Sequence, residues 1–102
     1  MIKAAVFCAA GMSTSLLVKK VKDAAKQRGV DIDIDAYPEG DMIKHTDVDV
    51  CLLGPQIKVL KDKADKIFTP HNIPVQVINT VDYGMMNGLK VLDTIISLAD
   101  KK

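Results

Sequence analysis

The sequence predicts an α/β fold: a four-stranded parallel sheet, strand order 2-1-3-4, with helices on both faces. Short apolar runs alternate along the chain with segments of helical periodicity, a pattern typical of parallel sheets covered by helices. The first and third runs are apolar on both sides and belong in the centre of the sheet. The second and fourth carry polar residues and belong at its edges. Right-handed crossovers are then satisfied by the order 2-1-3-4.

The first half of the chain reads as a strand, a helix and a second strand. Residues 2–7 are apolar except for Lys3, and the run ends at Cys8. The helix that follows repeats small and apolar residues on one face, namely Leu17, Val21, Ala24 and Ala25, and Gly29 ends it. Residues 31–36 alternate strictly, which indicates a half-buried strand. Its polar side carries Asp31, Asp33 and Asp35, a solvated face rather than a set of metal ligands.

The second half repeats the pattern twice. Residues 48–53 form the third strand, and Gly54 and Pro55 open a helix, because proline suits the first helical position. The inward face of that helix is Ile57, Leu60, Ala64 and Phe68. Residues 75–78 form a short fourth strand that contains Gln76. A last helix carries apolar residues at helical spacing: Met85, Leu89, Leu92, Ile96 and Ala99.

Composition narrows the class of protein. The 102 residues are 48% hydrophobic and 26% charged, with a formal net charge of +1, and we expect them to form a single domain over 1–102. The charge is not gathered into a basic tail or stripe and there is no tryptophan, so nucleic acid is a poor candidate for a partner. No apolar run reaches the roughly 18 residues of a spanning helix. We therefore expect a cytoplasmic protein without membrane insertion.

Neither the cysteines nor the histidines suggest a structural site. Two isolated cysteines, Cys8 and Cys51, do not make a disulfide framework and are expected to stay thiols in the cytoplasm. Cys51 lies within the third strand and is expected in the core. His45 and His71 fall in separate loops without partners at ligand spacing, so no metal site is expected.

The segment after Cys8 has the features of an anion-binding loop. Cys8 ends a central strand at the point where chain direction reverses in the sheet, and ligands of such sheets bind there. A loop entering a helix N-terminus presents N–H groups and a partial positive charge. The segment offers small residues and hydroxyls that suit a phosphate: Ala9, Ala10, Gly11, Met12, Ser13, Thr14 and Ser15. A thiolate at its mouth is a nucleophile. The simpler alternative is that Cys8 is a buried cysteine and the serines only cap a helix.

Four further residues are expected near the same edge: Gly54, Pro55, Gln56 and Tyr83. The first three follow the third strand and should face Cys8, where they either shape a docking surface for a partner or simply form the turn into a helix. Tyr83 either contacts the phosphate loop or anchors the last helix.

At this point the sequence resembles a known family, the IIB components of the bacterial sugar phosphotransferase system, of the lactose/cellobiose (N,N'-diacetylchitobiose) type. The resemblance is carried by four segments in order: residues 8–17 (CAAGMSTSLL), 36–39 (AYPE), 52–57 (LLGPQI), and 83–84 with 88–89 (YG and GL). These span almost the whole chain, and the first and third are specific.

The resemblance implies a phosphotransferase with a phosphocysteine intermediate. Cys8 would accept phosphate from a phosphohistidine on a IIA protein and donate it to a beta-linked disaccharide bound by the membrane IIC component. No cofactor or metal is needed, because the energy arrives in the donor's phosphoryl bond. The implied fold is a four-stranded parallel sheet with a phosphatase-like cysteine loop after the first strand.

Two alternatives remain open. The low-molecular-weight tyrosine phosphatases have a similar loop of cysteine, five residues, arginine and then serine or threonine, so a phosphatase or an arsenate-reductase-like enzyme using Cys8 is one of them. Counting from Cys8 puts Thr14 at the arginine position and Ser15 at the hydroxyl position. The missing guanidinium, which would grip the phosphate during attack by water, argues against hydrolysis. The other alternative is a binding module with an incidental Cys8.

Overall fold

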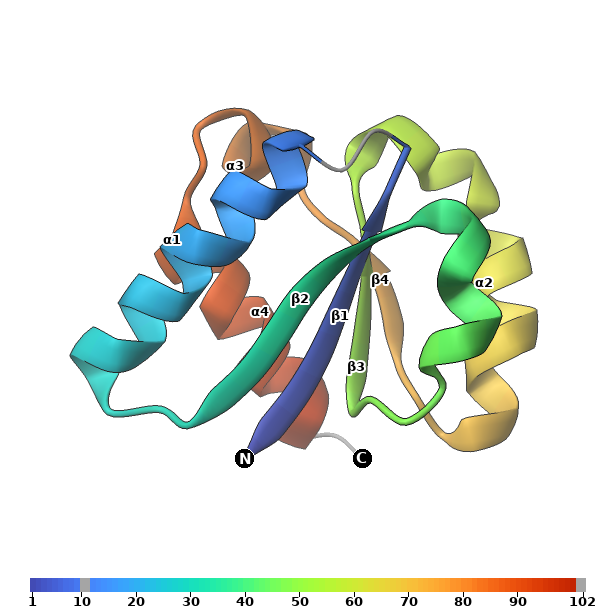
Figure 1. The fold of residues 1–102 in the computed structure, drawn as a ribbon, viewed down its shortest axis with the longest axis horizontal. Helices are drawn as coiled ribbons and strands as arrows, with labels where there is room; N and C mark the ends of the chain where they lie inside the picture. Colours follow the sequence, from blue (N-terminus) through green and yellow to red (C-terminus); the bar gives the residue numbers. More distant parts are fainter. Residues whose placement is uncertain (10–11, 101–102) are drawn as a thin grey trace.

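The four predicted strands form one parallel sheet. A computed structural model describes residues 1–9 and 12–100 of the protein, and its strands lie in the order β2-β1-β3-β4 (Figure 1). The strands are β1 (Ile2–Cys8), β2 (Ile32–Pro38), β3 (Val50–Leu53) and β4 (Val75–Val77). The predicted α/β fold and strand order are both confirmed.

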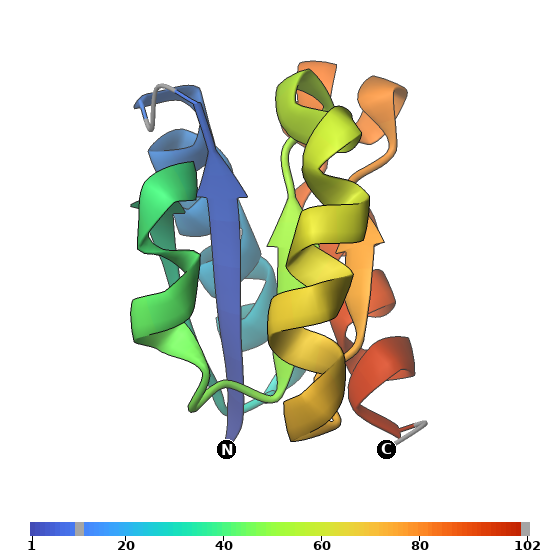
Figure 2. The same ribbon diagram turned by 90° about the vertical axis from the view of Figure 1, so that its right-hand side faces the viewer.

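Helices cover both faces of the sheet (Figure 2). On one side lie α1 (Met12–Arg28), the short α3 (Thr80–Gly84) and α4 (Gly88–Asp100). On the other lie α2 (Lys61–Phe68) and the 3₁₀ helices η1 (Glu39–His45), η2 (Pro55–Leu60) and η3 (Thr69–His71). The result is a three-layer arrangement with the sheet in the middle (Figure 1).

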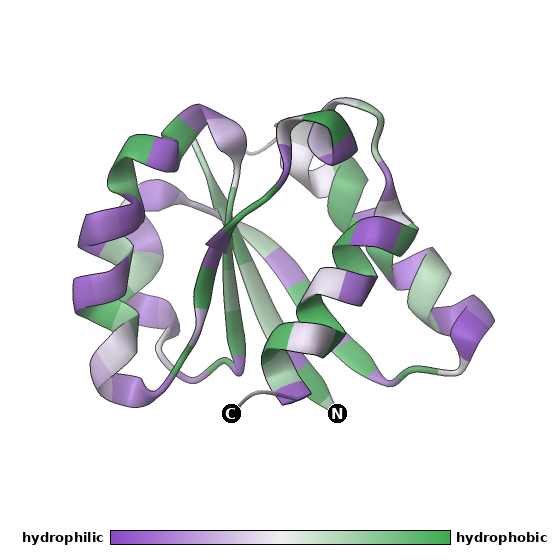
Figure 3. Ribbon diagram, turned by 180° about the vertical axis from the view of Figure 1, so that it is seen from behind, coloured by the Kyte–Doolittle hydropathy of each residue, from purple (hydrophilic) through white to green (hydrophobic). Residues whose placement is uncertain are grey.

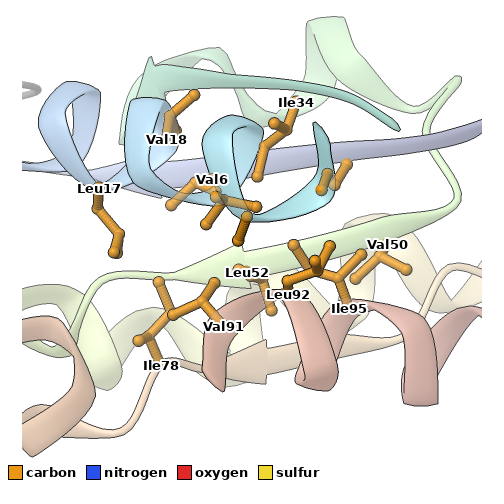
Figure 4. Packing of buried hydrophobic residues seen from close by; sticks show 14 of the residues in the cluster. Val6, Leu17, Val18, Ile34, Val50, Leu52, Ile78, Val91, Leu92 and Ile95 are labelled. Atoms are coloured by element: carbon orange, nitrogen blue, oxygen red, sulfur yellow. The ribbon is translucent and has the colours of Figure 1, made fainter. Parts of the chain in front are cut away.

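Each face of the sheet has its own buried cluster, because successive side chains of a strand point to opposite faces. Ala4 and Val6 of β1 pack with α1 and α4, and Figure 4 shows side chains of all these elements meeting in one layer. Ala5 and Phe7 pack instead with η1, α2 and the loop after η3. β1 is therefore apolar on both sides, as a central strand must be.

The edge strands carry the polar residues. Asp33 and Asp35 of β2 are exposed, and so is Gln76 of β4. Figure 3 shows mostly hydrophobic strands at the middle of the molecule and helices that alternate between hydrophobic and polar residues. No helix in the described part of the chain is long and apolar enough to cross a membrane.

Several predicted boundaries shift by a few residues. β2 starts one residue later than predicted and runs on to Pro38, which pairs with Cys8. β3 begins at Val50 rather than at residue 48. The helix after Gly54 begins as η2 and becomes α-helical only at Lys61, because Ile57 has non-helical dihedrals (φ −117°, ψ 26°).

The prediction for the last helix was wrong at its start. Met85 is 74% exposed and Leu89 47% exposed, and the buried face is instead Gly88, Val91, Leu92 and Ile95. A break at Met86, whose φ is +52°, separates α3 from α4. Gly88 then packs directly on the backbone of α1, since a Cβ built there would lie 2.5 Å from the carbonyl carbon and oxygen of Lys20. That close approach sets which face of α4 turns inward.

Candidate active site at the carboxyl edge of the sheet

The carboxyl ends of the strands meet at one edge, together with the start of α1 and with α3 (Figure 1). Cys8 is the last residue of β1 and lies between Pro38 of β2 and the end of β3. The backbone N–H of Gly54 donates to the carbonyl oxygen of Phe7 at 2.8 Å. Gly54 thus faces Cys8 across the switch point of the sheet, as expected from the sequence.

Cys8 itself is 3% exposed, while the next residue, Ala9, is exposed. The side chain of Cys8 is therefore buried, at the carboxyl end of β1 and next to an exposed residue. Of the residues predicted to bind phosphate, Ala10 and Gly11 lie outside the described residues. The side chains of Met12 and Ser13 lie outside them too.

The first turn of α1 is joined to α3 by a hydrogen bond between two side-chain hydroxyls. Thr14 Oγ1 and Tyr83 Oη lie 3.0 Å apart, although the residues are 69 positions apart in sequence. Thr14 is fully buried and Tyr83 is 8% exposed. Tyr83 thus contacts a residue of the predicted phosphate segment, and its ring also belongs to the buried cluster that includes α4. The hydroxyl of Thr14 points inward to this partner.

A residue that sequence reasoning missed, Asn79, holds α3 in place. Its Oδ1 accepts hydrogen bonds from the N–H groups of Val81 (2.8 Å) and Asp82 (3.3 Å), and it is the N-cap of α3. Asp82 is therefore inside the capped turn, and its own N–H is one of the two groups that Asn79 caps. The available signal was an asparagine directly after a strand and before a helical segment.

Pro55 and Gln56 form the start of η2. Pro55 takes the first helical position, as expected. Gln56 is exposed, and its Oε1 would lie 3.0 Å from a Cβ built on Gly54. The side chain of Gln56 thus folds back over Gly54, next to Cys8.

No guanidinium of this chain can reach the phosphate segment. The sequence contains one arginine, Arg28, and it is the last residue of α1, about 24 Å from the start of that helix at 1.5 Å per residue. There it is paired with Asp93 of α4. Lys61 and Asp65 of α2 are also paired with each other, at 2.8 Å.

The two thiols occupy different environments. Cys51 is fully buried in the middle of β3, and burial, reinforced by Asp65 and opposed by Lys61, raises the pKa of its thiol to about 12. It is a core residue, as predicted. Cys8 lies at the end of its strand beside the start of a helix.

The two histidines lie in separate 3₁₀ helices. His45 ends η1, not a loop as expected, and its ring stacks on Tyr37 with centroids 3.6 Å apart. His71 is exposed in η3. Within residues 1–9 and 12–100, there is no cluster of three or more groups that could hold a metal ion.

Comparison with known proteins decides the family. Residues 3–94 match the family described as "PTS system, Lactose/Cellobiose specific IIB subunit". The chain belongs to this family. It is therefore a sugar-specific IIB component of the phosphotransferase system, of lactose/cellobiose type, and components of this kind act as phosphotransferases alongside IIA and IIC components.

Curated relatives of this IIB component are named for several sugars. It is 46% identical over 94 residues to the galactose-specific EIIB component of Lactococcus lactis subsp. cremoris, covering 86% of this chain and 87% of the relative. It is 39% identical over 102 residues to the oligo-beta-mannoside-specific EIIB component of Bacillus subtilis, covering 96% of each.

A solved structure supports both fold and family. The solution structure of the cellobiose-specific phosphotransferase IIB component from Borrelia burgdorferi superposes with a TM-score of 0.82 at 39% identity. The match covers 99% of this chain and 94% of that one.

Proposed function

We propose that Cys8 is the phosphoryl carrier of this IIB component. Its thiolate sulfur attacks the phosphorus of a phosphohistidine on a IIA protein, forming an S–P bond as the P–N bond breaks and the imidazole leaves. A sugar hydroxyl bound by the membrane IIC component then attacks the same phosphorus. The S–P bond breaks, the hydroxyl proton goes to solvent, and the thiolate is regenerated. Both transfers take place at the cytoplasmic face.

The observation that carries this proposal is the position of Cys8 between the end of a central strand and the first turn of α1. Helix N-termini favour negative charge through their N–H groups and their dipole. A thiolate and, later, a phosphoryl group at Cys8 both benefit from this position. The predicted phosphate-binding residues 9–15 stay a proposal on the same basis.

The absence of a nearby guanidinium favours a carrier over a hydrolase. A phosphatase uses arginine to stabilise the charge that develops when water attacks, whereas Arg28 is held by Asp93 at the far end of α1. A carrier must keep its phosphocysteine intact until the acceptor arrives. The chain therefore supports group transfer better than hydrolysis.

The surface around Cys8 suits protein partners. Leu16 of α1, Val59 of η2 and Val81 of α3 are 49%, 83% and 64% exposed, on elements that begin at the carboxyl edge of the sheet. Large exposed apolar side chains can serve as contact points for a partner. We assign this surface, with Gly54, Pro55 and Gln56, to docking of the IIA and IIC partners.

The names of some relatives support a proposal for the class of sugar. Those named for cellobiose and oligo-beta-mannosides suggest a beta-linked disaccharide, and selection among such sugars belongs to the IIC component that binds them. No metal or cofactor takes part in the proposed transfer.

Mass measurement after incubation with a phosphorylated IIA protein tests the proposal. Wild-type protein should gain about 80 Da, the mass of one phosphoryl group, and Cys8→Ser should gain none, since a serine hydroxyl is a much weaker nucleophile at neutral pH. Cys51→Ala is the matched control and should be labelled like wild type. Labelling of Cys8→Ser, or of a histidine in wild type, would contradict the assignment.

A further inference from the structure

Thr14 is the one polar side chain that is fully buried among the described residues. It lies in the first turn of α1, within a cluster of apolar residues from α1, α4 and the sheet. A buried hydroxyl without a partner is strongly unfavourable, and here the partner is Tyr83 at 3.0 Å. The position of α1's first turn is therefore linked to the position of the Tyr83 ring.

The backbone of Tyr83 is connected to the sheet by hydrogen bonds. Ile78, directly after β4, donates its N–H to the carbonyl oxygen of Leu53 at 2.8 Å. The following residue, Asn79, caps α3, and its carbonyl oxygen accepts from the N–H of Tyr83 at 2.9 Å. The backbone of Tyr83 is thus tied to the end of β4 by a short series of hydrogen bonds.

The segment that starts at Cys8 is consequently held at both ends by the same sheet edge. At its start, Gly54 binds the carbonyl of Phe7. At its end, Tyr83 binds Thr14. The N–H groups at a helix start bind an anion only when they are aimed at it, and the Tyr83–Thr14 bond determines how the first turn of α1 lies relative to Cys8.

We propose that Tyr83 is a positioning residue for phosphoryl transfer, acting through Thr14 to hold the first turn of α1 against the phosphoryl group on Cys8. This inference rests on the proposed function of Cys8. Tyr83 is 8% exposed and offers little surface to a docking partner. Its loss should therefore slow the transfer step and leave docking of the donor unchanged.

The experiment compares Tyr83→Phe with wild type in single-turnover phosphorylation by a phosphorylated IIA protein. The saturating rate should fall about tenfold, the usual size of one lost buried hydrogen bond, while the donor concentration at half-saturation stays the same. Thr14→Ser, which keeps the hydroxyl, should retain most of the rate. Tyr37→Phe, at the only other tyrosine of the chain, should match wild type.

A double variant separates positioning from stability. Thr14→Val with Tyr83→Phe removes both hydroxyls, so neither is left buried without a partner, and the thermal midpoint should recover toward wild type. The transfer rate should stay low if the bond positions the helix. A rate that recovers with stability, or a Tyr83→Phe rate equal to wild type, would overturn the inference.

A second measurement needs no donor protein. Inorganic phosphate titrated into the ¹⁵N-labelled, unmodified protein should shift the amide signals of the first turn of α1, with about tenfold weaker binding in Tyr83→Phe. Equal binding in both proteins, or no shift in wild type, also overturns the inference. Failure of the IIA donor to label wild type would instead count against the function of Cys8, and the phosphate titration would still decide the role of Tyr83.

Discussion

Gly54 and Cys8 are neighbours at the carboxyl ends of the paired strands β3 and β1. A Cβ built on Gly54 would lie 3.5 Å from the Cβ of Cys8. This is ordinary van der Waals contact, and Gly54 has φ −62° and ψ 149°, which any residue before a proline adopts readily. The glycine is thus not required by the backbone. It leaves space next to the thiol.

Gly54→Ala should fold with a free energy of unfolding within about 1 kcal/mol of wild type, because its buried backbone is not strained and most of the space for the methyl group is at van der Waals distance. The new methyl comes closest to Oε1 of the flexible Gln56 side chain, at 3.0 Å, and lies at van der Waals distance from the Cβ of Cys8 and the carbonyl oxygen of Phe7. Gly54→Val should also fold but slow phosphorylation, because its γ-methyl groups reach toward the thiol. Urea titration and single-turnover labelling measure the two effects. Equal rates for all three proteins would mean that this space does not serve the reaction.

Gly88→Ala should destabilise the fold by roughly 1–3 kcal/mol, the usual effect of overpacking. The added Cβ would lie 2.5 Å from backbone atoms of Lys20, which cannot move without displacing α1. Gly84→Ala is the matched control, since nothing lies within 4 Å of a Cβ there. Chemical denaturation should show the control at or slightly above wild-type stability. Similar stability for both variants would show that α1 and α4 separate easily.

Asn79→Ala should destabilise the protein by about 1 kcal/mol through loss of the α3 cap and should also slow phosphoryl transfer, because α3 carries Tyr83. Asn87 offers a control, since its Oδ1 accepts from the N–H of Lys90 at the start of α4. Asn87→Ala should lower stability by a similar amount without slowing transfer. Thermal melts paired with single-turnover rates make the comparison, and a slowed Asn87→Ala would indicate a general effect of lost stability.

Cys51 should contribute to the pH dependence of stability. Burial raises the pKa of its thiol from 9.0 to about 12, so the folded state holds the proton longer than the unfolded state. The contribution of this proton binding to the free energy of unfolding is complete below pH 9 and is lost as the pH rises toward 12. Over this window, the free energy of unfolding should fall more steeply for wild type than for Cys51→Ala, by up to about 1.4 kcal/mol per pH unit. Parallel curves would contradict the burial effect.

The same thiol should resist alkylation in the folded state. In Cys8→Ser, Cys51 is the only cysteine left. Iodoacetamide at pH 8 should leave the native form of this variant unmodified and should alkylate Cys51 once the protein is unfolded in concentrated urea. Mass spectrometry distinguishes the two. Rapid modification of the native variant would mean that β3 opens readily.

Much of the architecture follows from local patterns in the sequence. The apolar character of residues 4–7 and 50–53 indicates burial on both faces and hence central strands, and Asp33, Asp35 and Gln76 indicate edges. Because the carboxyl ends of parallel strands share one edge, these patterns also bring Cys8 and Gly54 together. The quoted segments around them point to the family before any coordinates are seen.

Contacts between distant segments could not be predicted in this way. Helical spacing alone fits two different buried faces of the last helix. The close packing of Gly88 on the backbone of Lys20 determines which face is buried. Likewise, nothing in the local sequence around Thr14 shows that its hydroxyl turns inward. Its partner lies 69 residues away, on a helix placed by Asn79.

The sequence by itself thus determined the strands, their order, the family and the position of Cys8, because periodicity and short motifs are local properties of the chain. Only the tertiary structure decided which groups hold the segment after Cys8 in place and which face of α4 is buried. Those outcomes depend on close packing and hydrogen bonds between residues far apart in sequence, and such contacts exist only once the layers have assembled.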